Sequence, residues 1–435
     1  MPVWQTPFLR DATSHVASAE GLFDLAAKMD SPSTRVIIVG AGHAGGSVAG
    51  FLRQYGFEGP ITLIGDEPIP PYQRPPLSKA WLKGEADADS LQLKDPAWWA
   101  DNGVDLRVKG TVSAIDRQAR TVTAGGETLP YDALVLATGA RARRIALPGS
   151  ELDGVLFLRT AEDAERLKPR LGPGRRLAVI GGGYVGLEAA ASATALGGTA
   201  VVIEREARVL ARVASEPLST FYQVAHARRG VEILTGAAVV ALEGIGGVSA
   251  VVLADGRRIA CDTVLIGVGA IANTELAEAA GLACRDGVIV DTAARTEDPA
   301  IWAVGDVTRR PGGLFGGDIR FESVPNALEQ AKQAAAAIAG RDQPPAEVPW
   351  FWSDQFDLKL QMAGLARDTD QMVVRGDPDS ERFAVFHLMG DVIRCVEAVN
   401  APPEFMAGRL MIGRQTPVDA TRLADPAISM KEVAL

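Results

Sequence analysis

A repeated glycine pattern, GxGxxG, constrains the fold of this 435-residue chain more than any other feature. RVIIVGAGHAGG at residues 35–46 and LAVIGGGYVGLE at residues 177–188 each join a short apolar run to this pattern. An Ala-rich segment typical of a helix and a second apolar run follow each copy, at 47–55 and 61–64 and again at 187–196 and 200–203. The sequence therefore predicts two βαβ units.

Both copies have the context that turns a glycine pattern into a dinucleotide site. The first glycine permits a tight turn, the second lets the backbone approach a pyrophosphate, and the third lets helix and strand pack closely. The helix N-terminus then offers free N–H groups to the phosphates. An acid that can bind ribose hydroxyls, Asp66 or Glu204, follows each second apolar run. Two such sites suggest a tightly held flavin dinucleotide and an exchanging nicotinamide dinucleotide, which together perform hydride transfer.

Further apolar runs suggest how the chain is divided. Segments 131–139, 263–269 and 300–306 read as buried parallel strands, so one dinucleotide domain is interrupted by a second and then resumed. After a Pro-rich linker at 343–349, apolar and polar residues alternate over 356–365, 372–376 and 383–400, with a turn at Gly390–Asp391, and a helix is expected over 403–413.

The expected fold is therefore α/β, with two Rossmann-like domains and a small α+β C-terminal domain that holds an antiparallel sheet. The expected boundaries are an N-terminal extension at 1–33, an FAD domain at 34–148 and 273–348, an NAD domain at 149–272, and a C-terminal domain at 349–435.

The charge balance excludes some partners. With 44 Lys and Arg against 54 Asp and Glu, the net charge is −10, which argues against nucleic-acid binding and against a polybasic membrane anchor. No apolar run has the length of a membrane span, and the first residues lack the core of a signal peptide. We expect a cytoplasmic protein. Residues 1–28, with a short helix over 21–28, are expected to be dispensable, with Met29 as an alternative start.

Cysteine and histidine are scarce. The three cysteines, Cys261, Cys284 and Cys395, lie far apart, which excludes a disulfide framework, a CxxC motif and a cysteine zinc site. With only four histidines, no metal site is expected. Since no cysteine precedes Cys261, a redox-active cysteine pair beside the flavin is also excluded.

The chain resembles the FAD-dependent ferredoxin reductases that oxidise NADH, and several motifs carry this resemblance, which runs from about Arg35 to Val433. The motifs are DEPIPPYQRPPLSK (66–79), YDALVLATGARAR (131–143), GGGYVGLE (181–188), WAVGDV (302–307), ESVPNALEQA (322–331) and PWFWSDQ (349–355). The resemblance implies a glutathione-reductase-like fold, FAD as prosthetic group, NADH as donor and a 2Fe–2S ferredoxin as acceptor.

The resemblance assigns the first loop to FAD, with Gly40, Gly42 and Gly45 at the pyrophosphate and His43 and Ala44 between them. His43 is expected to be a solvent-facing filler. Because Gly65 follows the second apolar run, Asp66 is the expected ribose partner and Glu67 the alternative.

Other expected FAD contacts follow from the same resemblance. Asp306 would bind the ribityl chain, and Arg141 or Arg143 the pyrophosphate. Val324 lies just before a helix predicted over 326–339, whose positive end would face the flavin; ordinary capping is the alternative.

The second loop, with Gly181, Gly183 and Gly186, would hold NAD. Glu204 would bind the adenosine ribose and disfavour the 2′-phosphate of NADPH, although Arg205 and Arg208 soften that preference.

Four residues are candidates for the chemistry. Lys79 would lie beside the flavin ring and pair with Glu188, the alternative being a surface lysine. Tyr184 is either a lid over the flavin or a structural aromatic residue. Trp352 would lie between the flavin and the ferredoxin, or simply in the core.

The resulting interpretation is a reductase that takes a hydride from NADH and passes single electrons to a ferredoxin serving a P-450-type monooxygenase. A ring-hydroxylating dioxygenase is the alternative client. Reduction of a small molecule and an NAD-sensing flavoprotein like apoptosis-inducing factor are alternative functions. A monomer or weak dimer is expected.

Overall fold

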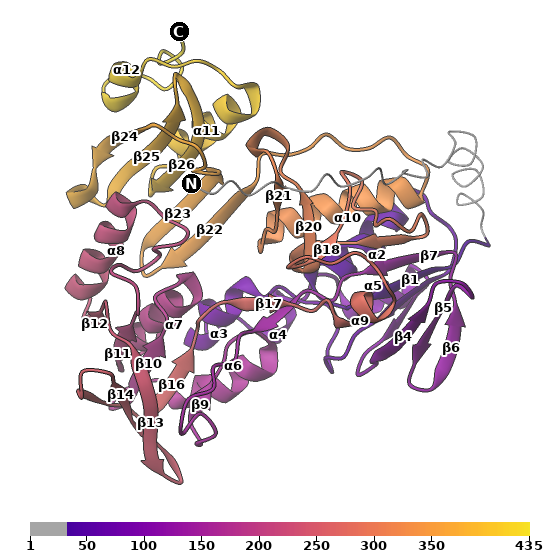
Figure 1. Ribbon diagram of the computed structural model, residues 1–435, viewed down its shortest axis with the longest axis horizontal. Coiled ribbons are helices and arrows are strands. Elements are labelled where there is room, and N and C mark those ends of the chain that lie inside the picture. The colour runs from indigo at the N-terminus through magenta and orange to yellow at the C-terminus, as the bar shows by residue number, and fades with distance from the viewer. Residues whose placement is uncertain (1–32) are drawn as a thin grey trace, which may run out of the picture.

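The computed structural model describes residues 33–435 (Figure 1). The expectations for the N-terminal segment, namely its dispensability, the helix over 21–28 and the start at Met29, lie outside the described residues.

A five-stranded parallel sheet with strand order β19–β7–β1–β2–β3 organises the first unit of the fold, which β19 joins from late in the sequence. Its strands are β1 (Val36–Val39), β2 (Ile61–Ile64), β3 (Val104–Arg107), β7 (Ala133–Leu136) and β19 (Ile301–Ala303). The sequence VIIV of β1 is buried at every position, as expected for a parallel strand covered on both faces.

The two faces of this sheet pack against different layers. Val36 and Ile38 share a core with α2 (His43–Gln54) and α10 (Val324–Ile338). Ile37 and Val39 point the other way and pack against a small antiparallel sheet, because successive strand residues face opposite sides. That sheet consists of β4 (Val112–Asp116), β5 (Thr121–Ala124) and β6 (Glu127–Pro130). Three short helices, α3 (Ala80–Lys83), α4 (Ala88–Leu91) and α5 (Pro96–Asp101), lie between β2 and β3 in sequence.

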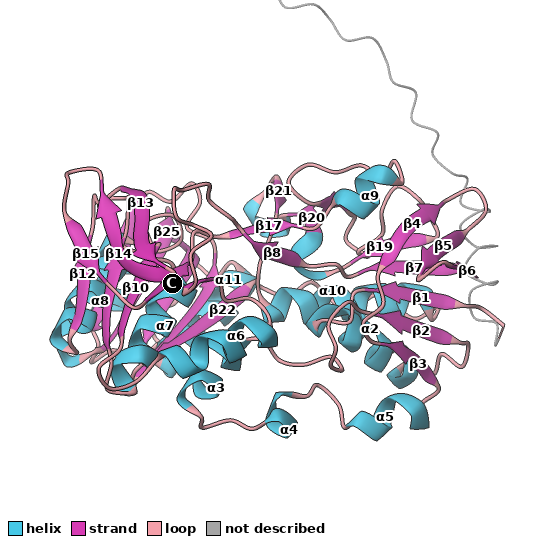
Figure 2. Cartoon of the chain, turned by 90° about the horizontal axis from the view of Figure 1, so that it is seen from below, coloured by secondary structure: helices cyan, strands magenta, loops and turns pink. Residues whose placement is uncertain are grey.

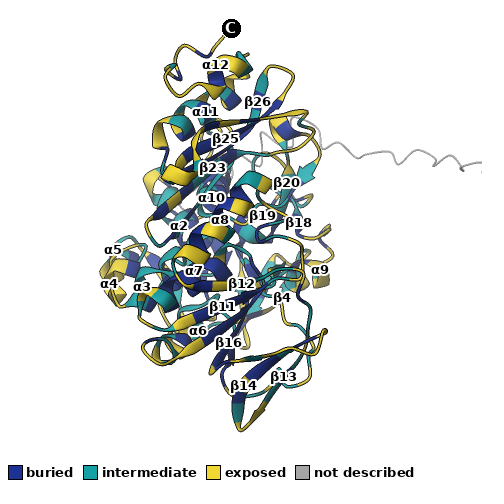
Figure 3. Ribbon diagram, turned by 90° about the vertical axis from the view of Figure 1, so that its left-hand side faces the viewer, coloured by how far each residue is buried: buried dark blue, intermediate teal, exposed yellow. Residues whose placement is uncertain are grey.

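A second parallel sheet, with strand order β12–β11–β10–β16–β9, repeats this plan and organises the second unit of the fold. Its strands are β9 (Val155–Leu156), β10 (Arg176–Ile180), β11 (Thr199–Ile203), β12 (Val231–Leu234) and β16 (Thr263–Ile266). One face packs on α6 (Ala161–Leu167), α7 (Tyr184–Ala195) and α8 (Glu216–Arg228). The other face packs on the antiparallel strands β13 (Val239–Ile245), β14 (Gly247–Leu253) and β15 (Arg258–Ala260). Buried residues concentrate on the strands and exposed ones on the outer faces of helices and turns (Figure 3).

The chain crosses between the two sheets twice. The strands β8 (Ala140–Ala142) and β17 (Ala270–Ala272) pair antiparallel and carry the outgoing and returning crossings (Figure 2). After the return, α9 (Glu275–Ala279) leads on to β19, which pairs with β7 in the first sheet. The first parallel sheet is thus interrupted in sequence by the second.

The C-terminal part is a five-stranded antiparallel sheet, β22–β23–β26–β25–β24, covered by a helix. Its elements are β22 (Trp350–Gln355), β23 (Leu358–Gly364), β24 (Gln371–Asp377), β25 (Arg382–Met389), β26 (Val392–Val399), α11 (Pro402–Arg414) and α12 (Ala420–Ala424). The predicted hairpin turn at Gly390–Asp391 joins β25 to β26. The first strand, β22, was not predicted, because three aromatic residues in succession indicate core without indicating a period.

None of the helices in the described part of the chain is long and apolar enough to cross a bilayer.

Candidate functional site

A cavity of about 890 Å³ lies where the carboxyl ends of the two parallel sheets face each other. Residues directly after strands of both sheets line it: Gly40, Gly65, Ala137 and Val304 from the first, and Gly181, Glu204 and Gly267 from the second. In open α/β sheets this edge is where ligands bind. The topology therefore brings both glycine loops to one cavity.

The first glycine loop fits its expected function residue by residue. Gly40 has φ of 108°, and a Cβ there would lie 2.2 Å from the carbonyl oxygen of Ala137. A Cβ on Gly45 would lie 1.9 Å from the Gly40 oxygen, so both positions exclude a side chain. At Gly42 the nearest atom is an Arg74 nitrogen at 3.8 Å, which leaves the backbone open to a pyrophosphate.

The second loop has the same construction. Gly181 has φ of 106° and would place a Cβ 2.5 Å from the Gly267 oxygen, whereas a Cβ on Gly183 meets nothing within 4 Å. A Cβ on Gly186 would lie 2.4 Å from the Gly181 oxygen. Glu204 lies beside this loop, where its Oε2 accepts from Gly182 N–H at 2.7 Å. Its Oε1 accepts from Glu206 N–H at 2.8 Å, so the carboxylate is fixed at the cavity.

An ion pair stands between the two loops. Lys79 Nζ lies 2.8 Å from Glu188 Oε2, with side-chain exposures of 17% and 4%. The predicted pairing is therefore formed, and the alternative of a surface lysine is wrong. Lys79 follows the 3-10 turn η1 (Pro75–Ser78) and donates to the Pro75 carbonyl at 3.2 Å. Both residues line the cavity, and the pair joins the first unit to helix α7.

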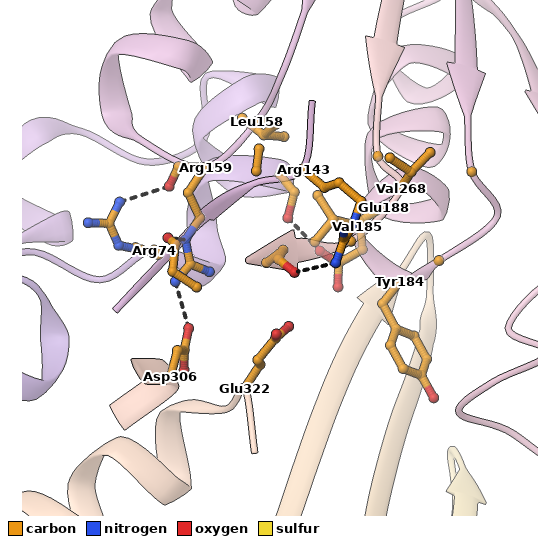
Figure 4. Close-up of a pocket in the computed structure, with 18 of the residues that line it drawn as sticks. Arg74, Arg143, Leu158, Arg159, Tyr184, Val185, Glu188, Val268, Asp306 and Glu322 are labelled. Atoms are coloured by element: carbon orange, nitrogen blue, oxygen red, sulfur yellow. Dashed lines mark hydrogen bonds and ion pairs between the residues drawn. The ribbon is translucent and has the colours of Figure 1, made fainter. Parts of the chain in front are cut away.

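A second charged cluster lies at the other end of the cavity (Figure 4). Asp306, in the turn after β19, accepts from Arg159 Nη2 at 2.6 Å. Arg74 Nη1 donates to the Arg159 carbonyl at 2.8 Å, and Arg74 also pairs with Glu67. Asp66 and Glu67 both line the cavity. The Glu67 carboxylate also accepts from the Tyr72 hydroxyl, whereas Asp66 is exposed.

Sequence reasoning did not identify Arg74 and Arg159 as site residues. They stand 85 positions apart and share no spacing pattern. The only sequence signal for Arg74 was its place in the motif at 66–79, and Arg159 follows an apolar run without a motif of its own.

His43 differs from its expectation as a solvent-facing filler. It is the first residue of α2, it lines the cavity with Ala44, and its Nδ1 is buried without a partner among the described residues. Burial, assisted by the Arg74 guanidinium, lowers the pKa of His43 to about 4. The ring is therefore neutral at neutral pH. The expectation fails because the half-buried ring lies on the cavity wall, within electrostatic range of Arg74 and Asp306.

The structure also separates Arg141 from Arg143. Arg143 lines the cavity. Arg141, expected at the cofactor, is directed elsewhere: it donates to Asn273 Oδ1 at 2.8 Å and pairs with Glu275 at 2.6 Å. The acceptors on the returning segment after β17 draw this side chain out of the cavity.

Aromatic residues close the cavity on the side of the C-terminal sheet. Tyr184, the first residue of α7, packs against Phe351 with ring centroids 4.6 Å apart and ring planes tilted by 41°. Its hydroxyl donates to Met362 Sδ at 2.9 Å. Burial raises the pKa of Tyr184 well above its usual value. Trp352 lines the cavity, and its ring centroid lies 5.5 Å from that of Trp350.

Val324 begins helix α10 at the cavity wall. Ser323 caps this helix by accepting from Asn326 N–H at 3.3 Å, so capping and a helix end directed at the cavity occur together.

The residues that line the cavity fit two dinucleotides and no metal. Both loops are closed to side chains at the first and third glycine and open at the second, as pyrophosphate binding requires. Among residues 33–435 no group of three or more His, Cys, Asp or Glu side chains is placed to hold a metal ion. The three cysteines are free, and none of them is among the described residues that line the cavity.

Comparison with known proteins assigns the chain to a family. Residues 34–331 match the family described as pyridine nucleotide-disulphide oxidoreductase, and residues 350–434 match the family described as reductase C-terminal.

Individual relatives agree with this assignment. The chain is 53% identical over 405 residues to a probable ferredoxin reductase, CtmF, of Castellaniella defragrans, covering 92% of this chain and 99% of the relative. It is 42% identical to putidaredoxin reductase CamA of Pseudomonas putida, covering 92% and 96% of the two chains.

Solved structures give the same result. The covalent putidaredoxin reductase–putidaredoxin complex superposes with a TM-score of 0.91 at 41% identity, covering 93% of this chain and 98% of that one. The ferredoxin reductase for the CYP199A2 system from Rhodopseudomonas palustris superposes with a TM-score of 0.89 at 40% identity, covering 93% and 100%. The expected resemblance and fold class are thereby confirmed. The chain belongs to the pyridine nucleotide-disulphide oxidoreductases and, within them, to the FAD-dependent ferredoxin reductases that oxidise NADH.

Proposed function

We propose that this reductase delivers single electrons to a 2Fe–2S ferredoxin that supplies a P-450-type monooxygenase. The observation that carries the proposal is one cavity shared by two glycine loops, a Lys79–Glu188 pair and Trp352, with no cysteine among its described lining residues. FAD, when bound, accepts a hydride from NADH and releases electrons singly. Without a cysteine pair to intervene, the electrons leave directly for the partner.

At the FAD end, Gly40, Gly42 and Gly45 hold the pyrophosphate. Three features support this assignment of the first loop. Gly42 is open, Asp306 is oriented by Arg159 for a ribityl hydroxyl, and the N-terminus of α10 presents its partial positive charge at Val324. Neutral His43, Ala44, Asp66 and Arg143 complete this wall.

At the NAD end, Gly181, Gly183 and Gly186 hold the second pyrophosphate. Glu204 accepts hydrogen bonds from the ribose hydroxyls, and its fixed negative charge disfavours the 2′-phosphate of NADPH. This arrangement supports NADH as the donor.

Between the two ends, Lys79 supplies a cation that favours the arrival of negative charge on the flavin ring. Glu188 holds the ammonium in place and limits its motion. Tyr184 would shield the flavin site and would have to move aside for the nicotinamide, and Trp352 would lie on the side that faces the ferredoxin.

The division of the chain follows the sheets. We assign 34–148 and 273–348 to the FAD domain, 149–272 to the NAD domain and 349–435 to the C-terminal domain. The support is that β19 pairs with β7, although the second parallel sheet separates them in sequence.

The P-450 client is supported by one relative, the reductase for the CYP199A2 system, at 40% identity. We place the reaction in the cytoplasm, where NADH is available, and expect a monomer or weak dimer, which light scattering of the purified protein would measure.

The test is a panel of purified 2Fe–2S ferredoxins from P-450 systems and from ring-hydroxylating dioxygenases. The flavin-loaded protein and NADH are mixed anaerobically with each one, and cluster reduction is followed by visible absorbance. We expect the fastest reduction with ferredoxins of P-450 systems. Faster reduction of dioxygenase ferredoxins would reassign the client, and failure to retain flavin or to reduce any ferredoxin would refute the proposal.

A further inference from the structure

The carboxylate of Glu188 accepts more hydrogen bonds than its pair with Lys79 requires. Its Oε2 accepts from Ser78 Oγ at 2.5 Å as well as from Lys79. Its Oε1 accepts from Ser353 Oγ at 2.6 Å. These donors come from η1 and from β22, so the carboxylate joins helix α7 to both the first unit and the C-terminal sheet.

A buried chain continues from Ser353 away from the cavity. Gln355 Nε2 donates to Ser353 Oγ at 3.1 Å, and His226 Nε2 lies 2.7 Å from Gln355 Oε1. All three side chains are fully buried, with exposures of 0%. His226 belongs to α8, so the chain runs from one helix of the second unit, through the C-terminal sheet, to another helix of the same unit.

The direction of every hydrogen bond in this chain follows from the first. A carboxylate only accepts, so the single hydroxyl proton of Ser353 points at Glu188. Ser353 Oγ must then accept from the Gln355 amide, whose carbonyl is left as an acceptor. His226 must donate to that carbonyl, which fixes its proton on Nε2. Burial lowers the pKa of His226 to about 4, so the ring stays neutral in this tautomer.

Hydrogen bonds aligned in one direction polarise one another, and in a buried site this strengthens the last bond, here to the carboxylate. We propose that Ser353, Gln355 and His226 are positioning residues that act as a one-way donor chain, holding Glu188 in the orientation that fixes Lys79 at the cavity. The proposal rests on the proposed function, in which Lys79 lies beside the flavin.

The donor chain also affects the neighbouring residue on β22. Successive residues of β22 face opposite sides, so Ser353 reaches Glu188 while its neighbour Trp352 lines the cavity and approaches Trp350. The bond from Ser353 therefore ties β22 to α7, in addition to the pairing of β22 with β23. It thereby links the strand that carries Trp352 to the carboxylate of the Lys79–Glu188 pair.

The first experiment compares Ser353→Ala with Ser353→Thr, which keeps the hydroxyl. The matched control is Ser219→Ala, which removes another fully buried hydroxyl outside the donor chain. That hydroxyl donates to the Val209 carbonyl at 2.6 Å and accepts from Arg208 Nη1 at 2.5 Å, so it too has a charged partner. Anaerobic stopped-flow measures flavin reduction by NADH, and a redox titration measures the flavin midpoint potential. We expect reduction about tenfold slower and a shifted potential for Ser353→Ala, the scale of a lost hydrogen bond to a charged group. Ser353→Thr and Ser219→Ala should stay near wild type in both measurements.

The second experiment needs no flavin. In the full-length protein labelled with ¹⁵N-histidine, the His226 resonance is identified by its loss in His226→Gln, and its nitrogen shifts report the tautomer. We expect the neutral Nε2–H form throughout pH 5.5–8. A proton on Nδ1 or a charged ring would overturn the donor chain.

The outcomes distinguish failure of the proposed function from failure of the donor chain. If wild type fails to bind flavin or to oxidise NADH, the proposed function fails, and the His226 tautomer still decides whether the chain exists. If wild type turns over normally and Ser353→Ala behaves like Ser219→Ala, only the positioning proposal fails.

Discussion

The two glycine loops are nearly identical locally, yet the helices behind them differ. Gly42 and Gly183 precede α2 and α7 with φ of −84° and −81°, and each helix has 12 residues. Helix α2 buries one face against α10 and the sheet. Helix α7 is buried continuously from residue 186 to 193, because β22, β11 and α3 enclose it.

This difference shows what a phosphate-binding motif leaves undetermined. The motif specifies the turn and the helix N-terminus, but the neighbours of the helix decide what its second turn does. Enclosed α7 carries a buried carboxylate, Glu188, whose partners come from η1, Lys79 and β22, whereas α2 carries no carboxylate. Four predictions test this comparison, from the largest expected effect to the smallest.

Removing the cation beside the enclosed helix should have the largest effect. Lys79→Met leaves Glu188 buried without its counter-charge, and we expect the free energy of unfolding to fall by about 3 kcal/mol. Adding Glu188→Gln should recover most of that loss. Chemical denaturation of the flavin-loaded protein measures both; equal stability of Lys79→Met and wild type would mean that the pair is not buried as described.

Substitution of the open glycine in each loop should separate the two dinucleotides. Neither Gly42→Ala nor Gly183→Ala meets protein atoms closer than 3.8 Å, so both variants should fold. We expect Gly42→Ala to retain about tenfold less FAD, and Gly183→Ala to keep FAD while its KM for NADH rises about tenfold. Flavin absorbance per chain and steady-state kinetics provide the readout. The reverse pattern would exchange the assignments of the loops.

Glu204, which lies beside the second loop, should affect only the choice between NADH and NADPH. Glu204→Gln keeps an acceptor for Gly182 N–H but removes the charge that repels a 2′-phosphate. We expect the preference for NADH over NADPH, measured as the ratio of kcat/KM values, to fall about fivefold. Asp66→Gln, in the first unit, is the control and should leave that ratio unchanged.

The smallest effect concerns the histidine of the first loop. Burial and Arg74 lower the pKa of His43 from 6.5 to about 4, so between these values the unfolded chain binds more protons than the native protein. Its contribution to stability is complete above pH 6.5 and is lost as the pH falls toward 4. We expect a slope of about 1 kcal/mol per pH unit within this window. His43→Gln should flatten that part of the stability–pH curve, and an unchanged slope would contradict a neutral buried ring.

Much of the architecture could be predicted because it depends on local patterns. The second strand of the first unit occupies the expected 61–64, and the buried runs at 131–139 and 263–269 contain β7 and β16. Helices α2 and α7 begin three or more residues earlier than expected, since the phosphate loop itself forms the first turn. Strand β22 was missed because WFW has no alternation of apolar and polar residues to reveal its two faces.

The site was predictable only in part. The spacing of the glycines predicts both phosphate loops, and the family resemblance predicts the pair of Lys79 and Glu188. Arg159 and the Ser353–Gln355–His226 chain had no signal, since each contact joins residues more than 100 positions apart or depends on which face of a strand is buried. The choice between Arg141 and Arg143 at the cofactor stays open in the sequence, because sequence alone cannot show which acceptors surround a side chain.

By itself, the sequence determined two dinucleotide-binding βαβ units, the absence of a cysteine pair before Cys261 and an acid after each unit, because all of these depend on residue identity and short spacing. Only the tertiary structure decided that both loops open into one cavity and that Glu188 is enclosed by donors from η1 and β22. The physical reason is that a buried charge is stable only where distant segments bring it partners, and those partners exist only once the sheets have packed.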